Sequence, residues 1–138
     1  MPLNKSQETL AEKLGLKRGI KLLILNPIEN MFEMLSPLHE ITILLRKVKG
    51  SADLALCFFN TRKQLDQELP RLEGLLRAGG FIWICWPAAE NGFESSLDES
   101  YIRQACKTMG LLETETCRLD GNWSGIKFVP ATMNDYGI

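Results

Sequence analysis

The hydrophobic residues of this chain fall into short runs that polar residues hardly interrupt. The most complete run, Phe81–Trp86, follows Gly79-Gly80 and ends at Pro87. A run without polar alternation is typical of a strand that is covered on both faces, as in the middle of a parallel sheet. Residues 20–26 and 53–59 have the same pattern, and we expect all three segments to be central strands.

One long helix is expected after the third strand. Thr61 with Gln64 matches a capping box, in which a hydroxyl and an amide side chain satisfy the first backbone N–H groups of a helix. From Leu65 onward, leucines recur at helical spacing. Pro70 is expected to kink this helix or split it in two, and Gly79-Gly80 to close it.

The remaining elements are shorter. Ser96 with Glu99 repeats the capping-box pattern and predicts a helix to about Met109. The turn signal Asp120-Gly121-Asn122 predicts an antiparallel hairpin. The other expected elements are helices over residues 6–14 and 28–35 and strands over residues 41–48, 112–119 and 126–129.

The order of these elements predicts an α/β fold. Strands that alternate with helices imply parallel crossovers, which are right-handed almost without exception. We therefore expect a three-layer, Rossmann-like mixed sheet of six strands in the order 2-1-3-4-6-5, with the last pair antiparallel. Residues 1–130 are expected to form one domain, followed by a tail over residues 131–138.

Composition excludes several classes of function. The formal net charge is −1, so no attraction to nucleic acid or to an anionic membrane is expected. No apolar run approaches the roughly 20 residues that cross a bilayer. The four cysteines contain no CxxC pair and His39 is the single histidine, which argues against zinc. We expect reduced thiols and a cytoplasmic protein.

The candidate binding site lies at the carboxyl ends of the strands, where ligands sit in open parallel sheets. Trp86 and Trp123 would form apolar walls, Asn26 and Asn60 would orient a polar group, and Arg62 would meet an anion at the start of a helix. The full set of candidate residues is Asn26, Pro27, Asn60, Thr61, Arg62, Trp86, Pro87, Trp123 and Ser124.

Each candidate also has a purely structural interpretation. Asn60-Thr61 caps a helix whether or not a ligand binds, and Asn26-Pro27 can simply end a strand. Trp86 suits either packing or a pocket, whereas Trp123 next to a turn can cover a hydrophobic edge. His39 fits a surface residue better than a catalytic base, because the sequence offers it no nucleophilic partner. We therefore assign no catalytic residue and no metal ligand.

Two resemblances support the predicted fold. The turn Leu76-Arg77-Ala78-Gly79-Gly80, the strand opening Asp53-Leu54-Ala55-Leu56 and the closing hairpin resemble S-adenosylmethionine-dependent methyltransferases over roughly residues 15–130. A second resemblance is to a family of short bacterial proteins with a domain of unknown function. It is carried by the segments 14–19, 23–26, Trp86-Pro87 and 123–129. That resemblance implies a Rossmann-like fold without a known activity.

The cofactor site that the methyltransferase resemblance implies is not matched by this sequence. The resemblance implies a glycine-rich turn after the first strand, but residues 26–30 contain no glycine. It also implies an acidic residue after the second strand, where Arg46 and Lys47 stand instead. These departures predict that no cofactor is bound and leave S-adenosylmethionine as the alternative.

Two functional hypotheses follow. The first is a non-catalytic Rossmann-like module that binds a small ligand or a protein, and the second is a divergent methyltransferase. A weak homodimer through the edge strand 112–119 is a further hypothesis. The charges of Glu113, Glu115 and Arg118 argue against it.

Overall fold

The computed structural model describes residues 9–36, 40–87, 97–120 and 122–131. The expected tail, His39 and the loop after Pro87 lie largely or wholly outside these ranges. The described elements are, in chain order, α1 (Leu10–Leu14), β1 (Lys21–Leu25), α2 (Met31–Leu35), β2 (Thr42–Leu44), β3 (Ala52–Phe58), α3 (Arg62–Leu75), β4 (Leu76–Pro87), α4 (Glu99–Thr108), β5 (Leu111–Arg118) and β6 (Trp123–Pro130).

The strands form one mixed sheet in the order β2-β1-β3-β4-β6-β5, as predicted. β1 pairs in parallel with β2 and β3, and β3 pairs in parallel with β4. β6 is antiparallel to both β4 and β5. β4 is the strand around which this sheet is built, because it joins the parallel half to the antiparallel half.

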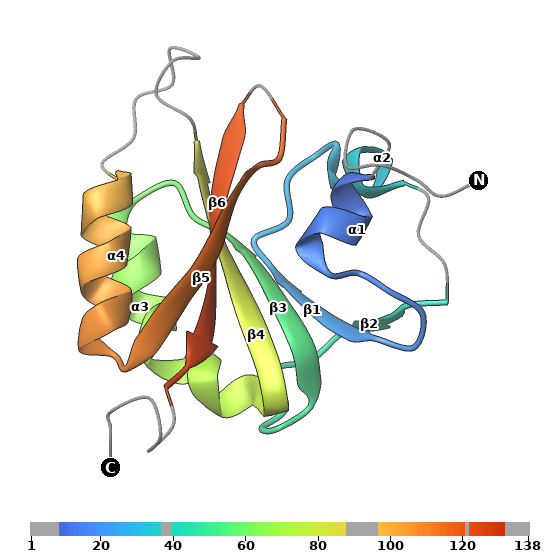
Figure 1. Cartoon of the computed structure of the whole chain (residues 1–138), viewed down its shortest axis with the longest axis horizontal. Coiled ribbons are helices and arrows are strands. Elements are labelled where there is room, and N and C mark those ends of the chain that lie inside the picture. The colour runs from blue at the N-terminus through green and yellow to red at the C-terminus, as the bar shows by residue number, and fades with distance from the viewer. Residues whose placement is uncertain (1–8, 37–39, 88–96, 121, 132–138) are drawn as a thin grey trace.

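Helices cover both faces of the sheet (Figure 1), as the apolar runs of the central strands require. On one face α3 and α4 pack over a core that includes Leu65, Leu72 and Ile102. On the other face α1 and α2 pack over a core that includes Leu14 and Met31. Alternate residues of β3 and β4 point into these two cores, so both strands are buried on each side.

The start of β4 differs from the prediction. The sequence predicts that Gly79-Gly80 closes the long helix, but α3 ends at Leu75 and the strand begins at Leu76. The β3–β4 register shifts between Ala52 and Leu54, and Gly79 has a φ of 82°. The glycines therefore form an irregularity within the strand, where positive φ and close backbone contact favour glycine.

Several other boundaries are also corrected. α1 is capped by Thr9, α2 begins only at Met31, β2 is three residues long, and β5 and β6 begin earlier than expected. The N-cap of α4 is Asp98 and not Ser96, because the Asp98 side chain accepts the N–H of Tyr101. α3 runs unbroken through Pro70. Buried leucines on both sides of Pro70 hold the helix to the sheet, and the proline itself is exposed.

β2 and β3 are connected without a helix. Residues 45–51 cross from the carboxyl end of β2 to the amino end of β3, next to α3. Lys47 Nζ lies 3.1 Å from each carboxylate oxygen of Glu68 on α3, and the N–H of Gly50 donates to the C=O of Gly74. These contacts fix the crossover, although Leu45 within it is 93% exposed.

Candidate functional site

The sheet places all the predicted site residues at one edge, which we call the carboxyl rim. Asn26 and Pro27 follow β1, and Asn60 follows β3, the neighbouring strand. Trp86 pairs with Ser124, and Pro87 pairs with Trp123, across β4 and β6. Asn26, Pro27, Asn60, Thr61 and Arg62 are exposed there, whereas Trp86 and Pro87 are buried.

The turn after β1 is sharp and contains no glycine. Asn26 has a φ of 54°, in the left-handed region that asparagine tolerates better than most residues other than glycine. Pro27 follows it and has no N–H group to donate. Asn30 precedes α2 without forming a side-chain capping bond. The turn therefore keeps a tight left-handed geometry while lacking one of its backbone donors.

Asn60 and Thr61 form hydrogen bonds that cap the amino end of α3. Thr61 Oγ1 accepts the N–H of Gln64 at 3.1 Å. Gln64 Oε1 in turn accepts the N–H groups of Asn60 and Thr61, at 2.6 and 3.3 Å. This reciprocal pattern is the predicted capping box. The structural interpretation of these two residues is confirmed, and a role in ligand binding stays a prediction.

Replacing Thr61 with alanine tests the capping role directly. We expect Thr61→Ala to lower the free energy of unfolding by about 1 kcal/mol, because the N–H of Gln64 loses its acceptor. Thr61→Ser keeps the hydroxyl and should stay close to the wild type. Urea unfolding of both variants measures the difference. Equal stability of Thr61→Ala and the wild type would contradict the capping role.

The two tryptophans of the site pack against protein. Trp86 is 8% exposed and belongs to the core under α3 and α4. Trp123 is half-buried, and its ring meets Phe58 edge-on, with centroids 5.3 Å apart. The packing interpretations of both residues therefore agree with the structure. Trp83 lies in the core, as expected for a residue of the covered run Phe81–Trp86, and its Nε1–H donates to the C=O of Leu14 at 2.8 Å.

Sequence reasoning missed a cluster beside Arg62. The guanidinium of Arg62 lies 4.4 Å from the centre of the Tyr101 ring. The hydroxyl of Tyr101 donates to the carboxylate of Asp66, 2.7–2.8 Å away, and this hydrogen bond raises the pKa of Tyr101. These contacts join the first two turns of α3 to the first turn of α4. Helical spacing predicts Tyr101 on the inner face of α4, but no local signal pairs it with a residue 35 positions earlier.

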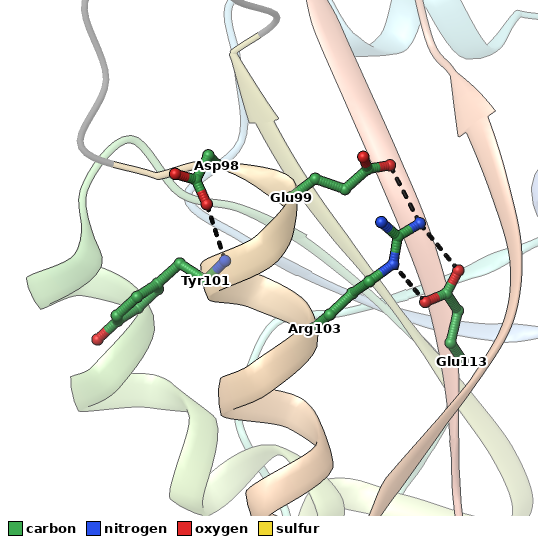
Figure 2. Close-up of polar contacts among 5 residues, drawn as sticks. All are labelled: Asp98, Glu99, Tyr101, Arg103 and Glu113. Carbon is green, nitrogen blue, oxygen red and sulfur yellow. Dashed lines mark hydrogen bonds and ion pairs between the residues drawn. The ribbon is translucent and has the colours of Figure 1, made fainter.

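A second polar network anchors α4 to β5. Figure 2 shows the guanidinium of Arg103 between Glu99 and Glu113, on the side of α4 away from Asp98 and Tyr101. Arg103 Nε lies 2.6 Å from Glu113 Oε1, and Nη2 lies 3.1 Å from Glu113 Oε2 and from Glu99 Oε1. Both partners are about a third or more exposed, so solvent screening keeps the stabilisation small. Hydrogen bonding from Arg103 lowers the pKa of Glu113.

This network gives a pH-dependent prediction. A carboxylate whose pKa is lower in the folded state stabilises the protein above the unfolded-state pKa, and that stabilisation disappears as the pH falls through the folded-state pKa. In Arg103→Gln, we expect the pKa of Glu113 to rise toward its ordinary value. Side-chain carboxyl NMR titration measures this change, and Arg71→Gln on the exposed side of α3 is the control. An unchanged Glu113 midpoint in Arg103→Gln would contradict the assignment.

Three of the four thiols are not placed for nucleophilic chemistry. All four cysteines are free, and Cys57, Cys85 and Cys106 are buried. Burial raises the pKa of Cys57 and Cys85 far above the ordinary thiol value, and raises that of Cys106 to about 12. Because the thiolate is the reactive form, these groups are inert at neutral pH. Within the described ranges, no three His, Cys, Asp or Glu side chains gather as metal ligands.

Solved structures define the class of fold. A SAM-dependent methyltransferase from Aquifex aeolicus matches with a TM-score of 0.61 at 12% identity, over 86% of this chain and 86% of that chain. The 1,6-didemethyltoxoflavin-N1-methyltransferase of Burkholderia thailandensis, with bound S-adenosylhomocysteine, gives 0.58 at 11% identity over 89% and 75%. Magnesium protoporphyrin IX methyltransferase of Synechocystis PCC 6803, with bound SAM, gives 0.56 at 11% over 88% and 74%. The fold is methyltransferase-like.

The sequence places the chain in a family. Residues 35–132 match the family described as Protein of unknown function (DUF3052), and the chain belongs to this family. The predicted membership of a family with a domain of unknown function is thereby confirmed. No curated protein matches the chain in sequence. Across the described part of the chain, every helix is too short or too polar to cross a bilayer.

Proposed function

We propose that this protein is a non-catalytic module that binds a small ligand or a segment of a partner protein at the carboxyl rim. The observation that carries this proposal is the turn after β1. Asn26 makes the turn in the left-handed region, and Pro27 follows without a backbone donor. The scaffold of a nucleotide-binding fold is present, but the turn at its binding edge contains no glycine and has one backbone N–H fewer at Pro27.

The residues at the rim do not fit S-adenosylmethionine. A cofactor held against bare backbone needs N–H groups and glycines at the end of the first strand. Here the proline ring and the asparagine side chain take those positions. After β2, where an acidic residue would take ribose hydroxyls, the chain has Arg46 and Lys47, and Lys47 is bound to Glu68. No reaction step is therefore assigned to this cofactor.

A divergent methyltransferase is the second candidate. Its support is the fold shared with enzymes solved with bound SAM or S-adenosylhomocysteine. At 11–12% identity these similarities support the fold, and fold alone does not license an activity.

A thermal-shift scan separates the two candidates. A ligand present at a hundred times its dissociation constant adds about 2.7 kcal/mol to the free energy of unfolding, which raises the melting temperature visibly. We expect no shift with S-adenosylmethionine, S-adenosylhomocysteine or free nucleotides. A clear shift with either methionine derivative, lost on substitution of Asn26 by a bulkier residue, would overturn the non-catalytic proposal in favour of the enzyme.

An NMR titration can show binding at the carboxyl rim directly. Titration of the chain with mixtures of small metabolites should move the backbone amide signals of Asn26, Asn60 and Arg62 together. Arg62→Gln should weaken the response if an anionic group is recognised, because the guanidinium is lost from the first turn of α3. If no mixture moves these three signals, the ligand of the carboxyl rim is a segment of a partner protein and not a small metabolite.

A further inference from the structure

The amino edge of the sheet, opposite the carboxyl rim, carries two adjoining clefts. The larger, of about 610 Å³, lies between the start of β4 and the end of β6. The smaller, of about 290 Å³, lies between the segment 17–20 and the starts of β3 and β4. Both clefts are lined by Ala78 and Gly79. Together they have the size of a small-ligand site, which is commonly some 300–1,000 Å³.

Three cationic side chains line these clefts. Lys17 and Arg18 border the smaller cleft, and Arg77 borders the larger. Arg18 also pairs with Glu40. The acidic residues in the lining are Asp53 and Glu73. Cations therefore exceed acids by one among the lining residues, although the whole chain carries a formal net charge of −1.

Asp53 lines the smaller cleft and pairs with Arg77, which lines the larger cleft. Asp53 Oδ2 accepts the N–H of Lys21 at 2.8 Å, and Asp53 Oδ1 lies 3.5 Å from Arg77 Nη1. Both carboxylate oxygens are thus engaged by the protein. Because a guanidinium has five N–H donors, the contact at Nη1 leaves the fork with donors for an anion. The Arg77 side chain is 51% exposed, so a ligand can reach it.

The clefts combine open backbone with apolar walls. Gly19 and Gly79 have φ values of 84° and 82°, and no atom lies within 4 Å of a Cβ built on either residue. Ile20 and Phe81 supply apolar surface in the smaller cleft. Lys127 Nζ lies 4.3 Å from the centre of the Phe81 ring. Apolar walls with a few converging polar groups are typical of sites for small organic molecules.

We propose that these clefts form a second binding site, for a small organic anion. Its carboxylate or phosphate group lies beside Gly79, between Arg77 and Lys17, and its apolar body lies against Phe81. Asp53 is a positioning residue, because it orients the guanidinium of Arg77. The site is separate from the carboxyl rim and does not depend on the function proposed there.

NMR titration of the whole chain tests this proposal. The probes are benzoate, phenyl phosphate and inorganic phosphate, followed by the backbone amide signals. We expect benzoate or phenyl phosphate to move the signals of Gly19, Gly79 and Phe81, and the stronger of the two identifies the anionic group. Arg77→Gln should weaken binding about tenfold, because a charge-assisted hydrogen bond is lost. Arg71→Gln, at an exposed arginine that lines neither cleft, should change nothing.

Three results would overturn the proposal. Equal shifts with inorganic phosphate would indicate an adventitious ion only. Loss of binding in Arg71→Gln to the same extent as in Arg77→Gln would indicate a general charge effect. An absence of shifts at Gly19, Gly79 and Phe81 would contradict binding at these clefts. If signals of Asn26 and Asn60 moved in their place, the result would support binding at the carboxyl rim. Well-dispersed spectra of both variants establish that they are folded.

Discussion

Replacing Trp83 with alanine is expected to lower the free energy of unfolding by about 4 kcal/mol. In the described part of the chain Trp83 is the largest fully buried side chain, in β4 beneath α1, so no other truncation should cost more. Its removal leaves a large cavity and strips the C=O of Leu14 of the indole N–H that it accepts at 2.8 Å. Urea unfolding monitored by far-ultraviolet circular dichroism gives the value.

Two variants make the Trp83 result interpretable. Trp83→Phe keeps most of the ring but loses the N–H donor, and we expect a smaller loss of about 2 kcal/mol. Trp123→Ala removes a half-buried ring at the carboxyl rim and should cost about 1 kcal/mol. A Trp83→Ala protein no less stable than Trp123→Ala would show that β4 is not the centre of the core.

Replacing Gly80 with alanine is expected to cost about 3 kcal/mol, the second-largest effect. A Cβ at this position would lie 2.9 Å from the carbonyl oxygen of Arg77 and 3.0 Å from that of Ala52. Both neighbours are backbone atoms, so no side-chain rotation relieves the contact. The contacts occur at the point where the register between β3 and β4 shifts. Thermal and urea unfolding both report the loss.

Gly74 provides the matched control for Gly80. It lies in the last turn of α3, and no atom lies within 4 Å of a Cβ built on it. Gly74→Ala should stabilise the protein by about 0.5–1 kcal/mol, because alanine favours the helix and restricts the unfolded chain. A Gly80→Ala protein as stable as Gly74→Ala would contradict the close backbone approach.

The sheet order could be predicted because its determinants are local. Apolar runs mark β1, β3 and β4, and glycine and proline bound the runs of β1 and β4. The handedness of crossovers leaves few arrangements for these strands. The hairpin signal after β5 fixes the antiparallel end of the sheet. Each of these signals lies within a short segment of the chain.

The predictions were wrong where a local sequence signal is compatible with two structures. Gly79-Gly80 looks like a helix end, but contact with the backbone of Ala52 decides that it belongs to a strand. Ser96 and Asp98 are both good helix caps, and only the orientation of the first turn of α4 selects Asp98. Pro70 is a signal for interruption of α3, yet tertiary packing holds the helix together.

The site could be predicted only as a location. Strand ends give the carboxyl rim, so the sequence places Asn26, Asn60 and Trp123 at one edge correctly. Burial of Trp86 and the contact of Arg62 with Tyr101 depend on how α4 packs against α3, which no sequence spacing encodes. The clefts at the amino edge are formed by the starts of β3 and β4, the end of β6 and the segment 17–20, which the sequence does not place side by side.

A crystal structure of the chain soaked with S-adenosylhomocysteine would show whether the turn at Asn26 and Pro27 can support an adenosine derivative. The turn contains no glycine, and Pro27 offers no backbone N–H for such a ligand. We therefore predict that the turn keeps its geometry and that no adenosine density lies above it. Density for the ribose and adenine seated over Pro27, with hydrogen bonds to the turn, would contradict this prediction and the non-catalytic function built on it.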